Sequence, residues 1–259
     1  MRKIGFFGLF LVFGVATFAL TAFPEELSVL IERARKGEAD AQFALAEAYR
    51  KGEGLPRSDA EAAQWYRKAA EQGVAEAQSI LGRMYREGEG VRQNSAEAVK
   101  WYRQAAEKGD ADSQVNLGKM YREGEGVPKN SAEAAKWYRQ AAEKGDPDAQ
   151  VSLGKMYRDG EGVPKNPAEA VKWYRNAAEQ DVVEAQTDLG LMYANGQGVG
   201  RNYVEAVNWY RKAAERGDAK AQHALGVMYH NGFGVERDDE VARKWFRKAA
   251  EQGYYDATR

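Results

Sequence analysis

Cysteine is absent from this 259-residue chain, and histidine occurs only twice. Without cysteine the fold cannot rest on disulfides, and thiolate nucleophiles and cysteine-containing zinc sites are excluded. The charge is also nearly balanced, since 38 basic and 39 acidic residues give a net charge of −1. Nucleic-acid binding needs a basic excess that neutralises phosphates, so we expect no nucleic-acid partner.

The two histidines, His223 and His230, stand seven positions apart in one predicted helix. Helical rise separates them by about 10 Å, whereas both ligand nitrogens of one zinc ion must lie about 2 Å from it. The Gly-x-Gly triplets, such as the one at 88–90, lack the Lys-Ser/Thr of a phosphate-binding loop and are predicted to be turns. We therefore predict no catalytic residue, no metal site and no cofactor, and hence a protein that is not an enzyme.

A long apolar run occurs only at the start of the chain. Arg2 and Lys3 precede an apolar stretch at 4–19, and small residues end it at Ala22. This layout is typical of a secretory signal, so we predict a signal peptide at 1–22 that is cleaved after Ala22.

The alternative is an uncleaved N-terminal anchor, because an apolar stretch of about twenty residues can cross a bilayer. Under either interpretation the remainder of the chain is exported. It would be periplasmic or secreted if cleaved, and anchored in the inner membrane facing the periplasm if not. Membrane contact is expected only through residues 1–22, and only if they are retained.

All six tryptophans coincide when the chain is shifted by 36 residues, at Trp65, Trp101, Trp137, Trp173, Trp209 and Trp245. A period of this length made of helical pairs indicates a stacked array. We predict an all-α fold, an α/α solenoid of six 36-residue helical hairpins at 38–73, 74–109, 110–145, 146–181, 182–217 and 218–253. Residues 23–37 are predicted to form an N-terminal capping helix, and 254–259 a truncated C-terminal segment.

The block at 110–145 contains the signals for two helices. Asn130 stands three residues before Glu133, as in a capping box, and so predicts the start of the second helix. Gly145 stands where a helix ends in a left-handed residue. At the equivalent position Asp181 replaces glycine, so either an aspartate adopts that conformation or the helix ends differently.

A glycine recurs in the middle of the first helix of five repeats, at Gly82, Gly118, Gly154, Gly190 and Gly226, with Ala46 in the first repeat. Such a glycine costs about 1 kcal/mol against alanine. Its recurrence predicts that two helices approach too closely there for a larger side chain. The tryptophans and their neighbouring tyrosines are predicted to be core.

The repeated motif is carried in full by residues 77–109. They read A-x-x-x-L-G-x-M-Y, then G-x-G-V, then E-A-x-x-W-Y-R-x-A-A-E-x-G. This pattern resembles the Sel1-like repeat of bacterial proteins, a relative of the tetratricopeptide repeat, over residues 38–253. The resemblance implies a right-handed superhelical scaffold that binds a protein or peptide partner in its concave groove, and it does not imply catalysis.

Three functions remain open on this resemblance. The first is an exported protein–protein interaction scaffold or adaptor in the bacterial cell envelope. The second is a periplasmic immunity protein that sequesters a delivered toxin, as periplasmic relatives suggest. The third is an enzyme acting on the cell wall or on β-lactams, which has been proposed for a cysteine-rich branch whose disulfide-closed hairpins have no counterpart here.

The resemblance places the first helix of each hairpin on the concave face. The predicted partner-binding residues there are Arg50, Arg86, Arg122, Arg158, Ala194 and His230 at one position, Arg83, Lys119, Lys155, Leu191 and Val227 at a second, and His223 nearby. The predicted groove is therefore charged in the early repeats and apolar in the late ones.

Two interpretations of this face remain. One is a groove whose partner spans the junction between repeats four and five. The other is a solvated face whose charges neutralise each other, because Arg83 precedes Glu87, Lys119 precedes Glu123 and Lys155 precedes Asp159 by four residues. Similarly, the late aromatics Phe233, Phe246, Tyr254 and Tyr255 either complete the core or contact a partner.

Overall fold

The computed structural model describes residues 24–254. The predicted signal peptide, its cleavage site and Tyr255 lie outside the described residues. Every secondary-structure element of the described residues is an α-helix, and loops join these helices. The first, α1 (Pro24–Arg35), precedes six helical hairpins. The hairpins are α2 (Ala39–Lys51) with α3 (Asp59–Glu71), α4 (Ala75–Glu87) with α5 (Ser95–Glu107), α6 (Ala111–Glu123) with α7 (Ser131–Glu143), α8 (Pro147–Asp159) with α9 (Pro167–Glu179), α10 (Val183–Asn195) with α11 (Tyr203–Glu215), and α12 (Ala219–Asn231) with α13 (Asp239–Glu251).

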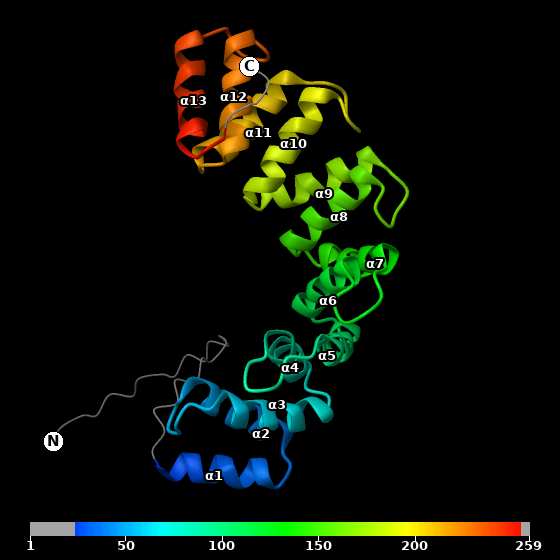
Figure 1. Ribbon diagram of the computed structural model, residues 1–259, viewed down its shortest axis with the longest axis vertical. Helices are drawn as coiled ribbons and strands as arrows, with labels where there is room; N and C mark the ends of the chain where they lie inside the picture. Colours follow the sequence, from blue (N-terminus) through cyan, green and yellow to red (C-terminus); the bar gives the residue numbers. More distant parts are fainter. Residues whose placement is uncertain (1–23, 255–259) are drawn as a thin grey trace, which may run out of the picture.

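Each hairpin packs on the next, and the stack winds from α1 at one end to α13 at the other (Figure 1). The predicted all-α solenoid of six repeats is confirmed. Among the helices from α1 to α13, not one has both the length and the apolar character needed to cross a membrane.

The two helices of a hairpin are held together by a tyrosine that lies on the recurring glycine. A Cβ atom added to Gly118 of α6 would lie 2.9 Å from the Tyr138 ring of α7. Tyr138 is itself 1% exposed. Glycine therefore allows the ring to lie close against α6, as its recurrence predicts. In the last repeat Phe246 covers Gly226 in the same way, whereas the first repeat buries Ala46 at this position.

The core is a continuous row of small and large side chains, but the tryptophans do not share one environment. Trp101 and Trp137 are buried, at 6% and 9% exposure. The other four are half-buried. The expectation of a tryptophan core is therefore met in the middle of the array and only partly toward its ends.

The ends of the helices follow the cap signals of the sequence with one correction. The Asn130 side chain accepts from the Glu133 backbone N–H at 3.0 Å, as predicted. However, the Asn130 N–H donates to the Tyr121 carbonyl, and the Glu133 carboxylate pairs with Lys136 at 2.8 Å. The cap is therefore one-sided, because the Tyr121 carbonyl of α6 already accepts from the Asn130 N–H that the glutamate would reach in a full capping box.

Positive φ angles occur where the turns require them. Gly145 has φ 96°, and Asp181, at the equivalent position one repeat later, has φ 63°. Aspartate thus adopts the left-handed conformation that glycine takes elsewhere, the first of the two outcomes open from the sequence. In repeats two to six the second glycine of the Gly-x-Gly turn has a packing role as well: a Cβ at Gly126 would lie 2.4 Å from the Ser95 carbonyl carbon of the preceding repeat.

A buried glutamine joins each repeat to the one before it. Gln114 is 1% exposed, and its side-chain amide donates to the Ala106 carbonyl at 3.0 Å and to Gln140 at 3.1 Å. The same amide-to-carbonyl bond recurs from Gln42, Gln78, Gln150, Gln186 and Gln222. A buried amide left unpaired would be costly, so these bonds fix the register between repeats.

The two ends of the array differ. At the first end, Leu30, Ile31 and Ala34 of α1 pack with Leu45 of α2. At the other end, α13 exposes Arg243 at the position where α11 buries Val207 at 2% exposure. The outer face of the sixth repeat is therefore polar, as the end of a solenoid requires.

Candidate functional site

Three of the arginines predicted to line the groove, Arg86, Arg122 and Arg158, join neighbouring repeats. The Arg122 guanidinium lies 2.7 Å from the Glu161 carboxylate, which stands in the loop after α8, and the Ser131 hydroxyl also donates to Glu161 at 3.2 Å. Hydrogen bonds from Arg122 hold the pKa of Glu161 below its usual range. We call such a set of arginine, serine and glutamate a rung, and its charges are satisfied within the protein.

The rung is repeated once and then changes. Arg86, Ser95 and Glu125 form the same set, with 2.8 Å between Arg86 and Glu125. Arg158 has no such glutamate, because Gln197 occupies that place in the next loop. Arg158 instead pairs with Asp159 at 2.9 Å and Asp188 at 3.3 Å.

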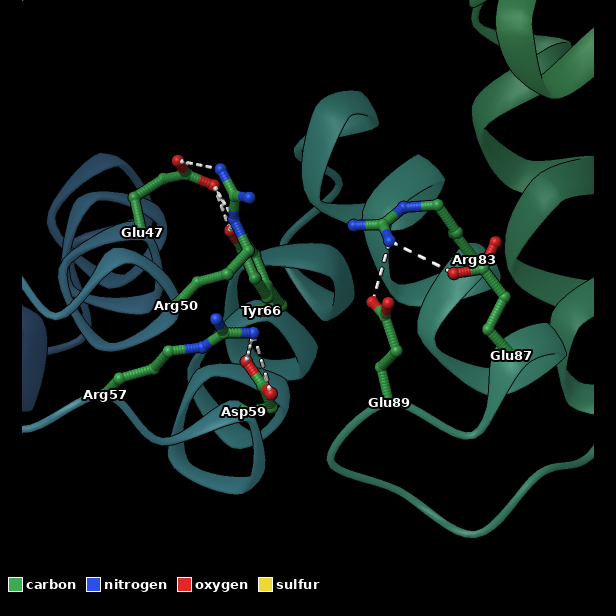
Figure 2. Close-up of polar contacts among 8 residues, drawn as sticks. All are labelled: Glu47, Arg50, Arg57, Asp59, Tyr66, Arg83, Glu87 and Glu89. Atoms are coloured by element: carbon green, nitrogen blue, oxygen red, sulfur yellow. Dashed lines mark hydrogen bonds and ion pairs between the residues drawn. The ribbon is translucent and has the colours of Figure 1, made fainter.

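The first repeat forms its own cluster (Figure 2). Arg50 pairs with Glu47 at 2.7 Å, and the Tyr66 hydroxyl donates to the same carboxylate. Burial would raise the pKa of Glu47, but hydrogen bonds from Arg50, Tyr66 and Lys51 outweigh it and lower the pKa to about 2. Because these groups satisfy one another, Arg50 is not available as an isolated cation.

At the second groove position the predicted pairing is correct in one repeat. Arg83 lies 3.2 Å from Glu87, as predicted, and also 2.7 Å from Glu89 (Figure 2). Lys155 instead lies 2.8 Å from Glu184 in the next repeat. The expected pair between Lys155 and Asp159 is therefore wrong, because Arg158 takes the Asp159 carboxylate.

Lys119 is the exception at this position. It forms no ion pair with any residue from 24 to 254, so the expected pair with Glu123 is also wrong. Lys119 lines a cleft of about 300 Å³. The other residues lining the cleft are Ser79, Ile80, Arg83, Tyr102, Asp112, Val115, Asn116, Asp146 and Asp148. The unpaired lysine can donate to peptide carbonyls and to carboxylates, and the three aspartates beside it can accept from backbone N–H groups and from basic side chains.

The apolar end of the same surface begins at α10. Leu191 is 41% exposed, and Ala194 and Val227 are half-buried. One turn before Leu191, burial raises the pKa of Asp188, an effect that Arg158 partly offsets. The change from charged to apolar character thus takes place between α8 and α10.

We call the outward surface of α4, α6, α8, α10 and α12 the even-helix surface.

The histidines contact different groups. His230 Nδ1 lies 2.7 Å from Asp239. The His223 ring lies 5.2 Å from Phe246 and 5.5 Å from Tyr254. In the described part of the chain, three or more potential metal ligands do not come together anywhere.

Sequence reasoning missed two features of this region. It did not select Tyr203 or Val204, which lie at the start of α11 beside Phe233. It also missed the buried glutamine that joins the repeats. Both have a signal in the sequence. A glutamine stands at the same place in all six copies, after alanine in five of them and after Ser113 in the third, and Tyr203 stands where other copies have short polar residues or proline.

Comparison with protein families gives six matches to the Sel1 repeat, at 39–74, 75–110, 111–146, 147–182, 183–218 and 219–254. These limits lie one residue after those predicted. A search of curated protein sequences gave no match.

Among solved structures, c5321, described as a protective antigen present in uropathogenic Escherichia coli strains, is 44% identical with a TM-score of 0.81. That match covers 88% of this chain and 49% of c5321, so the chain spans about half the length of that relative. A Sel1 repeat protein from Oxalobacter formigenes is 37% identical over 91% of this chain and 92% of its own, with a TM-score of 0.70. The immunity protein Pa5087 from Pseudomonas aeruginosa is 22% identical over 83% of this chain and 81% of its own, with a TM-score of 0.43, and no shared role follows from a likeness at that level.

Proposed function

Because the chain belongs to the Sel1 repeat family, whose members generally mediate protein–protein interaction, we propose that it is an exported interaction scaffold that binds a protein partner on its even-helix surface. The observation that carries this proposal is the contrast between two sets of residues. The glycines, tyrosines and glutamines that stack the repeats recur from copy to copy. The residues that the even helices turn outward change instead from charged to apolar between the fourth and fifth copies.

The outward-facing residues of the even helices offer two kinds of contact. Lys119 and its cleft of about 300 Å³ can hold a polar segment. Leu191, 41% exposed, can be covered by an apolar side chain. Since interface energy concentrates in desolvated anchors, Leu191 is the proposed anchor and Lys119 sets orientation. Arg86 and Arg122 are left out of the binding role because loop glutamates already neutralise them.

Site-specific photocrosslinking tests the proposal. A photoreactive residue is placed at position 119 or 191 in the full chain, expressed in its own cells, and irradiated. Position 100 in α5 serves as the control, because the Lys100 side chain is 58% exposed but does not belong to the even-helix surface. The proposal expects one protein to crosslink from 119 and 191 and not from 100. Equal crosslinking from all three positions would reject it.

Export rests on the layout of residues 1–22 and is tested separately. Intact-mass measurement of the protein from fractionated cells should give a chain that begins at or near Phe23, in the soluble periplasmic or secreted fraction. A full-length chain that sediments with the inner membrane would instead identify an anchor.

A further inference from the structure

The rung of the middle repeats has an apolar counterpart later in the array. Two repeats after Arg122, Ser131 and Glu161, the same positions hold Ala194, Tyr203 and Phe233. The copy between them keeps the arginine as Arg158 but has lost the loop glutamate, and two repeats after the rung all three positions are apolar or aromatic. At these positions one complete contact is therefore replaced by another, and no unpaired charge is left.

The new contact is an ordered aromatic pair. The Tyr203 and Phe233 rings lie 4.8 Å apart at an interplanar angle of 10°. The backbone fixes their separation, because a Cβ added to Gly234 would lie 2.4 Å from the Tyr203 carbonyl carbon. The loop that carries Phe233 is thus held against the start of α11, and the pair forms a rigid platform.

This platform is exposed and has apolar surface beside it. Phe233 is 40% exposed, and Val204 is 55% exposed at a position where four other copies have alanine. Beyond the solenoid ends, the large exposed apolar side chains of the described residues are Leu191, Val204 and Phe233, all in repeats five and six. Of these, Val204 and Phe233 lie at the platform, where the loop of Phe233 meets the start of α11. Neighbouring exposed apolar side chains of this kind indicate a surface that a partner covers.

A cation lies over the same platform. The Arg201 guanidinium lies 5.5 Å from the centre of the Tyr203 ring. Arg201 is exposed and makes no ion pair within residues 24–254, whereas its equivalent in the next repeat, Arg237, lies 2.9 Å from Asp239. A guanidinium stacked on an aromatic ring has its orientation restricted and presents its N–H groups to a carboxylate in fork geometry.

We propose that Arg201, Tyr203, Val204 and Phe233, here called the aromatic patch, dock a protein segment that carries an aromatic or aliphatic side chain next to a carboxylate. The apolar side chain covers Val204 and Phe233, and the carboxylate accepts from Arg201. The patch goes beyond the proposed even-helix surface, because its residues belong to α11 and to the loops.

The chain itself supplies the variant that tests the patch. The triple substitution A194R/Y203S/F233E rebuilds the rung that the middle repeats already contain, so it removes the patch with residues that suit the fold. Val204→Ala restores the alanine of four other copies. Val29→Ala is the matched control, since Val29 on α1 is 51% exposed and distant along the chain. Circular dichroism and thermal melting check that each variant folds like the parent.

The probe is a library of short random peptides displayed on phage, selected on the full chain. Enriched sequences should pair Trp, Phe or Leu with a neighbouring Asp or Glu. By fluorescence anisotropy, the synthesised peptides should bind the rebuilt-rung variant about tenfold or more weakly, as expected for loss of an aromatic anchor. Val204→Ala should bind more weakly than the parent, and Val29→Ala should bind equally.

Four results would each overturn the proposal. They are equal binding by the parent and the rebuilt-rung variant, enriched peptides without acidic residues, the absence of any enriched peptide, and a parent dimer in sedimentation velocity that the rebuilt-rung variant loses. The last result would assign the patch to a second copy of the chain. None of them bears on crosslinking from positions 119 and 191, so the failure of this proposal and that of the even-helix surface are distinguishable.

Discussion

Arg122 and Glu161 lie 39 positions apart in the chain, and their charged groups lie 2.7 Å apart across a repeat boundary. Their side chains are 34% and 29% exposed. Ion pairs with this much solvent contact contribute about 0 to 1 kcal/mol. The pair therefore serves mainly to set the register of neighbouring repeats and to neutralise a charge that would otherwise face a partner.

We predict that Arg122→Ala lowers the free energy of unfolding by about 1 kcal/mol or less. A double-mutant cycle with Glu161→Gln isolates the pair, because each single substitution also changes local hydration. Urea denaturation measures all four proteins. A coupling energy well above about 2 kcal/mol would contradict the interpretation of a solvent-screened pair and assign the rung a main stabilising role.

The second prediction concerns the glycine beneath the tyrosine. Gly118→Ala should gain about 1 kcal/mol in helix propensity but lose about 1 to 3 kcal/mol by overpacking against Tyr138, giving a net destabilisation. Gly200→Ala is the control, because the space around Gly200 is open. Thermal melting should show a lower midpoint for the first variant only. A midpoint for Gly118→Ala at or above that of Gly200→Ala would show that the helices have room to separate.

The third prediction concerns the tryptophans. Trp137→Ala removes a side chain that is 9% exposed at the centre of the array and should cost about 3 to 5 kcal/mol. Because neighbouring repeats share interface energy, the loss of hydrogen-exchange protection should extend into adjacent hairpins. Trp245→Ala, at a half-buried position in the last helix, should cost clearly less. Equal urea midpoints for the two variants would contradict the assignment of Trp137 to the core.

The fourth prediction follows from the lowered pKa of Glu47. Burial opposes ionisation of this carboxylate, but hydrogen bonds from Arg50, Tyr66 and Lys51 lower its pKa to about 2. The unfolded chain therefore binds a proton at higher pH than the folded chain does. The stability that this group contributes is present above about pH 4.5 and is lost as the pH falls toward 2.

Glu47→Gln should therefore flatten the fall in stability between those pH values. Glu53→Gln, in the adjoining loop, is the control, since no ion pair of Glu53 is found within residues 24–254. Chemical denaturation at a series of pH values measures both. If Glu47→Gln and its parent lose stability in parallel below pH 4.5, the cluster in the first repeat does not hold Glu47 ionised.

The fold could be predicted almost completely because a repeat displays its requirements several times. One glycine in a helix is ambiguous, but five in register imply a close neighbour, and the structure identifies that neighbour as tyrosine in four copies and phenylalanine in the last. At residue 181 the sequence left two outcomes open, and the structure shows the left-handed one, with φ 63°, because the turn requires a positive φ whatever residue occupies it. Local geometry of this kind is set within a few residues of the chain.

The even-helix surface was predicted less well, for a physical reason. Pairing at four-residue spacing was expected from the helix alone, but Lys155 pairs with Glu184 across a repeat boundary. Arg122 likewise pairs with a loop glutamate of the next repeat. A sequence shows which charges exist. Which partner each one takes depends on distances between repeats that only the packed array defines, and those distances left Lys119 unpaired.

The central claim is that a protein partner binds the even-helix surface and that Leu191 anchors it. Titration calorimetry with the crosslinked partner, using Leu191→Asp beside Arg122→Ala and checking folding by circular dichroism, tests this most directly. We predict that Leu191→Asp weakens binding about tenfold or more, because a charge is placed at the desolvated anchor. Arg122→Ala should change the affinity by less than about fivefold, because its charge is already neutralised by Glu161. Two folded variants that both bind like the parent would contradict the claim.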